Sequence, residues 1–214
     1  WDVFEDLSDE DDAKVDQLVR IIQYLKILPV KTIIMDKVEA DDVISVLSRE
    51  FPKHYNSQVF IISSDQDFLQ LVEKDVILYR PMEKIFYTPE MVFERYGVLK
   101  ENFIIYKTLM GDTSDKLEGI KGLGVKKLFK YFPELKERKI TLKDIFKLSE
   151  EKIKEHIIFP RILQDRKRLE NTYKIMDLSK PLISEEEIVL LREAIEGEVP
   201  KLMKEEFLNL YEKD

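Results

Sequence analysis

The sequence contains no cysteine, which excludes a disulfide framework and any metal site built on thiolates. It has only two histidines, His54 and His156, and we interpret both as surface residues because they lie outside the acidic and glycine-rich motifs. No apolar run approaches the roughly 18 residues that a membrane span needs, and the N-terminus carries no export signal. We therefore expect a cytoplasmic protein with no membrane partner, in which any metal ion is held by oxygen, favouring Mg²⁺ or Mn²⁺ over zinc.

Glycine is also scarce, and half of it stands in one place. Three of the six glycines are Gly119, Gly122 and Gly124, directly before Val125-Lys126-Lys127. Glycine lets a backbone approach a phosphate closely, and a helix that follows adds its N-terminal dipole and two ammonium groups. Because ordinary turns and helix caps use glycine as well, the run alone is a weak signal for phosphate binding.

The net charge of −8 argues at first against a nucleic-acid partner. The charge is uneven, however: residues 1–16 hold eight acidic side chains and one lysine, whereas residues 100–139 hold ten basic and six acidic ones. A local basic face is therefore possible on an acidic protein. A second basic stretch, Arg161, Arg166, Lys167 and Arg168, is as compatible with a solvated helix face as with phosphate contacts.

The pattern of apolar residues predicts strands alternating with helices, followed by helices alone. After an acidic lead-in to Asp12 we expect a helix that ends before Pro29, then buried-type strands at 30–35 and 59–64 and further strands at 76–79 and 84–87. One expected helix follows Glu39 and ends at Phe51. Further helices are expected at 68–72, 89–96, 101–110, 124–131, 141–148, 150–158, 160–173 and 185–196, and a last one begins at Pro200. The fold class is α/β, a mostly parallel sheet flanked by helices, with boundaries at 1–98, 99–180 and 181–214.

Three acidic clusters stand out. Glu39, Asp41 and Asp42 follow the first predicted strand, Asp65 and Asp67 follow the second, and Asp112 and Asp115 are spaced to share one side of a helical turn. Ligand sites of open parallel sheets lie beyond the carboxyl ends of the strands, so seven carboxylates can converge. Taken singly, each cluster has a simpler explanation: the enrichment of acids at a helix N-terminus for the first, a capping turn for the second and a helix N-cap for the third. Together they favour two divalent cations about 3.5–4 Å apart.

In order and spacing, residues 38–42, 62–68 and 110–127 resemble the phage and bacterial 5′-nuclease family of flap endonucleases, 5′–3′ exonucleases and phage RNase H. The resemblance spans roughly residues 11 to 180. It implies a metal-dependent nuclease acting at 5′ ends and flaps of branched DNA or RNA–DNA during replication, with duplex nucleic acid and replication proteins as partners. The implied metal ligands are Glu39, Asp41, Asp42, Asp65, Asp67, Asp112 and Asp115. All of them except Asp42 are also the implied catalytic residues.

The glycine-rich segment resembles the family's helix-three-turn-helix, which grips duplex backbone and can hold a potassium ion. The DNA-binding residues this implies are Lys121, Gly122, Gly124, Val125, Lys126 and Lys127. The family's first Asp-bearing strands and its basic helical arch have no counterpart after Trp1, so the chain resembles the C-terminal two-thirds of such an enzyme. Two alternatives stay open: a non-catalytic duplex-binding module, or an inactive fragment whose cleavage needs an upstream part. A ribonuclease of PIN-like architecture is weaker, because of the glycine-rich clamp.

Overall fold

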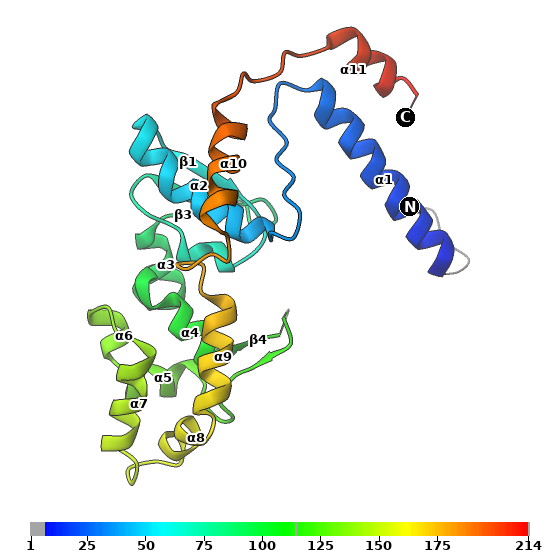
Figure 1. Ribbon diagram of the computed structural model, residues 1–214. Helices are drawn as coiled ribbons and strands as arrows, with labels where there is room; N and C mark the ends of the chain where they lie inside the picture. The colour runs from blue at the N-terminus through cyan, green and yellow to red at the C-terminus, as the bar shows by residue number, and fades with distance from the viewer. Residues whose placement is uncertain (1–6, 114, 214) are drawn as a thin grey trace. The chain divides into compact units, whose positions relative to one another are not determined.

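The computed structural model describes residues 7–113 and 115–213 (Figure 1). The chain forms two compact units, one made of the stretch up to Lys37 together with Ser184 onward, and the other of Val38–Ile183. All of the predicted metal ligands and DNA-binding residues belong to the second unit. Among the described residues, none of the helices combines the length and the apolarity that crossing a lipid bilayer requires.

The first unit consists of helices and one extended segment. Its helices are α1 (Leu7–Ile27), α10 (Glu185–Glu196) and α11 (Lys204–Tyr211). The expected acidic loop is helical from Leu7 onward, while residues 1–6 lie outside the described part. Helix α10 starts at the predicted capping box, in which Ser184 accepts from the Glu187 N–H at 3.2 Å. Helix α11 begins four residues after Pro200 rather than at it.

The strand predicted at residues 30–35 is absent. This segment has no regular secondary structure, and its backbone makes a local hydrogen bond from the Val30 N–H to the Leu28 carbonyl at 2.8 Å. Its β-branched side chains favour a strand only where a neighbouring strand pairs with them, and no such neighbour exists among the described residues. Lys31 instead reaches α10 and donates to the carbonyls of Ile195 and Gly197.

The second unit begins with α2 (Ala40–Tyr55) and a three-stranded sheet in the order β1–β2–β3. Strand β1 (Val59–Ile62) runs parallel to β2 (Val76–Arg80), and β3 (Ile85–Tyr87) pairs antiparallel with β2 as the expected edge pair. Side chains alternate along β2, with Leu78 fully buried. The acidic turn at Asp65 and Asp67 therefore leaves the carboxyl end of β1, as predicted.

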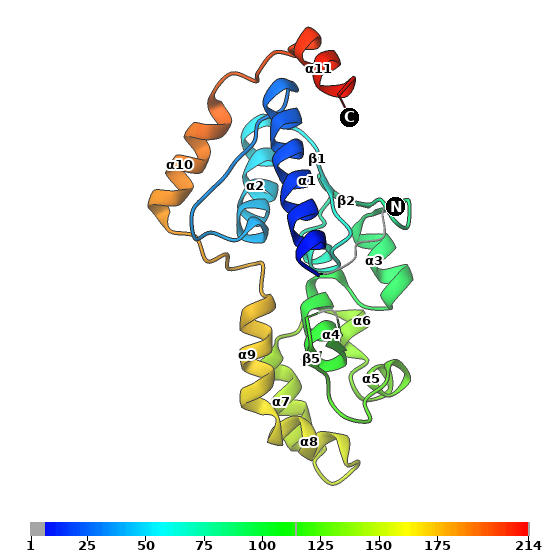
Figure 2. The ribbon, with the colours of Figure 1, turned by 90° about the vertical axis from the view of Figure 1, so that its right-hand side faces the viewer.

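Helices make up the rest of the second unit. They are η1 (Asp67–Gln70), α3 (Pro89–Tyr96), η2 (Lys100–Asn102), α4 (Phe103–Met110), α5 (Val125–Tyr131), α6 (Glu134–Glu137), α7 (Leu142–Glu151), α8 (Ile158–Gln164) and α9 (Arg166–Met176). Helix α9 lies alongside α4 in both views (Figures 1 and 2). One hydrophobic core runs from Ile61 to Leu178 and includes the fully buried Phe103 and Phe159.

Three further expectations about this region need correction. The helix predicted at 150–158 is a turn, because α7 ends at Glu151 and α8 begins only at Ile158. The helix predicted at 160–173 is broken at Asp165. Asp112 does not lie on a helical turn: β4 (Gly111–Asp112) and β5 (Leu117–Glu118) form a hairpin that leaves the end of α4.

Glycine explains that hairpin. Gly111 has φ +83°, and a Cβ there would stand 2.4 Å from the Gly119 nitrogen. A Cβ on Gly119 would stand 2.2 Å from the Met110 carbonyl oxygen. Two backbones thus touch at the base of the hairpin, which only glycine permits. Gly119 is therefore used for packing and not for approach to a phosphate.

Candidate metal and nucleic-acid site

The three acidic clusters act on one another in the folded chain. Burial raises the pKa of Asp41, and the charges of Asp65, Glu39, Asp42 and Asp115 raise it further. Burial likewise raises the pKa of Asp67, with smaller contributions from Asp65 and Asp115 that Lys107 opposes. Mutual repulsion of this kind requires carboxylates from α2, from the turn after β1 and from the β4–β5 hairpin to share one region. Six of the seven predicted ligands thus lie close enough for their charges to affect the pKa of Asp41 or Asp67.

The seventh predicted ligand, Asp112, joins the cluster through a cation that the sequence did not suggest. Lys107, in α4, is 5% exposed, and its ammonium pairs with both Asp67 and Asp112. Burial lowers the pKa of Lys107, but the hydrogen bonds to Asp112 and Asp67 outweigh that effect and the pKa rises. A lone lysine in the apolar run Phe103–Met110 was the available signal, because such a residue needs a buried partner.

Local backbone geometry presents the other carboxylates. Glu39 is the N-cap of α2 yet makes no side-chain capping bond, so capping does not account for it. Asp65 Oδ1 accepts from the Asp67 N–H at 2.8 Å, so the capping-turn interpretation holds for one oxygen of that side chain. Among the described residues, Asp41, Asp65 and Asp115 form no ion pair with a lysine or arginine. These oxygens remain available to a cation.

The chemistry of this donor set fits a hard divalent cation, since every ligand is a carboxylate oxygen and their shared field is negative. In the described part of the chain, no three acidic or histidine side chains are already arranged around one point. Asp67 and Asp112 are neutralised by Lys107, whereas Asp41, Asp65 and Asp115 are not. The cluster is thus chemically suited to metal ions but not closed around one.

The glycine-rich loop lies beside this cluster. Gly122 has φ +84°, which favours glycine, while a Cβ on Gly124 would meet nothing within 4 Å. Lys121, Lys126 and Val125 are exposed. Lys127 is exposed too, but its ammonium donates to the Gly122 carbonyl at 3.0 Å. The open backbone at Gly124 is the part of the loop that a phosphate can approach.

One cleft contains a residue from each of the two candidate regions. A cavity of about 1240 Å³ is lined by the predicted ligand Asp112 together with its partner Lys107, and by Lys121 of the glycine-rich loop. Lys116, in the hairpin turn, lies between them along the chain and also lines the cleft. A cleft lined by both carboxylates and basic groups suits a polyanion that has to reach a metal centre.

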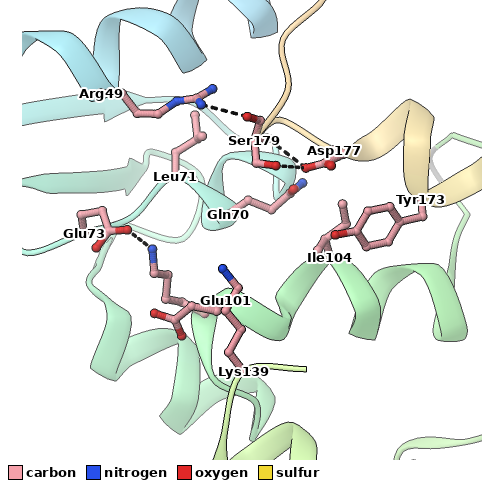
Figure 3. A pocket seen from close by; sticks show the side chains of 11 residues that line it. Arg49, Gln70, Leu71, Glu73, Glu101, Ile104, Lys139, Tyr173, Asp177 and Ser179 are labelled. Atoms are coloured by element: carbon pink, nitrogen blue, oxygen red, sulfur yellow. Dashed lines mark hydrogen bonds and ion pairs between the residues drawn. The ribbon is translucent and has the colours of Figure 1, made fainter. Parts of the chain in front are cut away.

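A smaller cavity of about 260 Å³ contains none of the predicted site residues (Figure 3). Its polar groups are occupied with one another: Lys100 pairs with Glu73, Arg49 donates to the Ser179 carbonyl at 2.9 Å, and the Ser179 hydroxyl donates to Asp177 at 2.5 Å. We interpret it as a cavity whose polar groups hold the unit together, and not as a reaction site.

Comparison with known proteins finds similarity to 5′–3′ exonucleases. Residues 8–97 match the family model described as the 5′–3′ exonuclease N-terminal resolvase-like domain. The chain is 34% identical over 115 residues to a 5′–3′ exonuclease of Buchnera aphidicola, spanning 54% of this chain and 40% of that one. It is 31% identical over 197 residues to a 5′–3′ exonuclease of Aquifex aeolicus, covering 91% of this chain and 65% of that one. The chain thus spans less than two-thirds of these relatives.

Solved structures give the same fold. A flap endonuclease of bacteriophage T5, in a complex with DNA and metal ions, matches 98% of this chain and 72% of its own, with a TM-score of 0.69 and 20% identity. A T5 5′-exonuclease with bound zinc ions matches 83% of this chain and 60% of its own, with a TM-score of 0.57. At this identity the likeness shows the fold alone.

Proposed function

Because the chain is related to the 5′–3′ exonucleases, we propose that it is a divalent-metal-dependent phosphodiesterase that acts at 5′ ends and flaps of branched DNA or RNA–DNA. The observation that carries this proposal is the cleft lined by Asp112 of the carboxylate cluster and by Lys121 of the loop. A duplex held at the loop can extend one strand toward the carboxylates through that cleft.

We assign the ligands of two ions, Mg²⁺ or Mn²⁺, to the carboxylate cluster. Glu39, Asp41 and Asp42 serve one ion, while Asp65, Asp67, Asp112 and Asp115 hold or orient the other. When bound, such ions supply Lewis-acid stabilisation of a phosphate and lower the pKa of a coordinated water. Lys107 keeps Asp67 and Asp112 side by side from the core of α4, which fixes their positions before an ion or substrate arrives.

The loop supplies backbone recognition without sequence readout. Lys121, Lys126 and Lys127, together with the open backbone at Gly124, contact phosphates. Phosphate contacts carry no base information, so affinity should be similar for duplexes of different sequence.

Cleavage of a 5′-flap oligonucleotide in Mg²⁺ tests the proposal. The double variant Asp67→Asn with Asp112→Asn should lose about a hundredfold or more of the single-turnover rate, since two ligands of one ion are gone. It should also lose the heat of Mn²⁺ binding in titration calorimetry. Asp75→Asn, in an exposed turn away from the cluster, is the matched control and should cleave like the unaltered chain.

One observation favours a second candidate function, a non-catalytic DNA-binding module. Lys107 pairs with both Asp67 and Asp112, and carboxylates whose charge is compensated by a lysine do not require a metal ion. A chain that binds duplex and flap DNA but cleaves neither, and binds no Mn²⁺, would be the non-catalytic module instead.

A further inference from the structure

Cationic side chains cap the carbonyl groups of the glycine-rich loop. Arg161, in α8, donates from Nη1 to the Lys121 carbonyl at 2.8 Å. Arg168, in α9, donates to the Glu118 carbonyl and, at 3.4 Å, to that of Gly119. With the bond from Lys127 to Gly122, four carbonyls between residues 118 and 122 each face a cation.

The two arginines are held in place for this contact. A Cβ on Gly122 would stand 3.1 Å from Arg161 Nη1, so the guanidinium packs directly against the loop backbone. Asp165 accepts from Arg168 Nη2 at 2.5 Å and so anchors that side chain from its own helix. Both arginines are half-buried. A solvated helix face shows neither feature.

Arg166, in the same helix as Arg168, shows the difference. It pairs with Glu150 at 3.4 Å and with Glu170 at 3.2 Å, and its guanidinium stacks 4.7 Å from the ring of Phe146. Among the described residues, it forms no hydrogen bond or ion pair with the loop. Arg166 therefore provides a matched control of equal charge.

These contacts bear on the potassium ion that the family resemblance implies. Carbonyl oxygens that converge in a tight loop need a cation or strong donors. At Lys121 and Gly122 such donors are present as side chains of this chain, Arg161 and Lys127. The residues present therefore do not fit a potassium ion that organises the loop.

We propose that Arg161 and Arg168 are positioning residues of the loop, which they hold in its phosphate-binding shape in place of a monovalent cation. The inference rests on the proposed duplex binding. Its consequence is that duplex affinity is independent of the identity of the monovalent cation and is lost when the two guanidinium groups are removed.

The first test measures affinity for a blunt duplex at constant ionic strength, in K⁺ and in tetramethylammonium. The unaltered chain should bind equally in both. Arg161→Ala with Arg168→Ala should bind about tenfold more weakly in tetramethylammonium, because charged hydrogen bonds to the loop are lost, and K⁺ should restore part of that loss. Arg166→Ala should behave like the unaltered chain, and Arg161→Lys should keep most of the affinity.

The second test needs no DNA. Amide hydrogen exchange of residues 118–126 should be about tenfold faster in the double variant and unchanged in Arg166→Ala. Unchanged exchange in α7 and α9 would show that the rest of the fold is intact. The two arginine-to-lysine variants repeat the measurement if the alanine variant does not fold.

The outcomes separate this inference from the proposed function. A chain that binds no duplex overturns the proposed function, while hydrogen exchange still decides whether the arginines brace the loop. Duplex binding that needs K⁺ in the unaltered chain, or a double variant equal to Arg166→Ala in affinity and exchange, overturns the inference alone.

Discussion

At the scale of single residues, Lys107 organises the acidic cluster. Its side chain is 6% exposed, and the side chains of its partners Asp67 and Asp112 are 15% and 13% exposed. Asp67 lies 40 residues before Lys107 in the sequence and Asp112 lies five after it, so no local sequence pattern predicts that the three side chains meet. The contact follows from tertiary packing of α4 against the turn after β1.

Replacing Lys107 tests how much that pairing contributes. Lys107→Met leaves two buried carboxylates without their cation and should lower the free energy of unfolding by about 3 kcal/mol in chelator. Lys100→Met is the control, since its partner Glu73 is 60% exposed, and should cost about 1 kcal/mol or less. Urea unfolding measures both. Similar losses for the two variants would show that the Lys107 pair is no stronger than a surface pair.

The raised pKa of Asp41 leads to a prediction about how the stability of the fold changes with pH. Its pKa is raised above the ordinary 3.8 by burial and by the neighbouring carboxylates, so the folded chain keeps this proton to higher pH than the unfolded chain. The free energy of unfolding therefore falls as the pH rises from 3.8 through the raised value. With metal chelated, Asp41→Asn should be more stable than the unaltered chain at pH 7, and the difference should shrink toward pH 3.8. A gain for Asp41→Asn that is constant across pH would contradict the argument.

At the scale of elements, the β4–β5 hairpin positions Asp112, and its geometry depends on two glycines in contact. Gly119→Ala places a Cβ 2.2 Å from the Met110 carbonyl oxygen and should destabilise the fold by about 1–3 kcal/mol. Mn²⁺ affinity should fall with it, because Asp112 loses its support. Gly124→Ala meets nothing within 4 Å and should leave stability unchanged. Thermal unfolding and Mn²⁺ calorimetry of the two variants give the comparison, which fails if both glycines tolerate alanine equally.

Elements with local signals could be predicted from the sequence, and elements that depend on distant partners could not. Thr88 caps α3 with proline at the first helical position, and Ser184 begins the capping box of α10. These signals act within four residues. The segment 30–35 failed because a strand needs a neighbour that pairs with it, which propensity does not supply. The β4–β5 hairpin was missed because its glycines resemble a phosphate loop.

At the scale of the whole molecule, charge segregation matters more than net charge. The chain carries −8 overall, yet residues 100–139 hold ten basic and six acidic side chains, and Lys121 of that stretch lines a cleft with Asp112. Among the predicted ligands, the carboxylate types and their order were readable from the sequence, whereas their mutual repulsion and the neutralising lysine required the fold. Arg161 and Arg168 were read as a basic stretch, but packing turns them toward the loop.

Duplex binding should therefore depend on salt and on a few loop lysines. Lys126 is exposed and forms no ion pair among the described residues, so Lys126→Ala removes charge without loosening the loop. Affinity should weaken equally for duplexes of different sequence, and the slope of log affinity against log salt should become shallower by about 0.9 for one lost phosphate contact. Lys143→Ala, which removes an exposed lysine on α7, should change neither. Fluorescence anisotropy from 50 to 200 mM salt measures the slopes; an unchanged slope, or a loss confined to one sequence, would mean that the loop does not grip backbone phosphates.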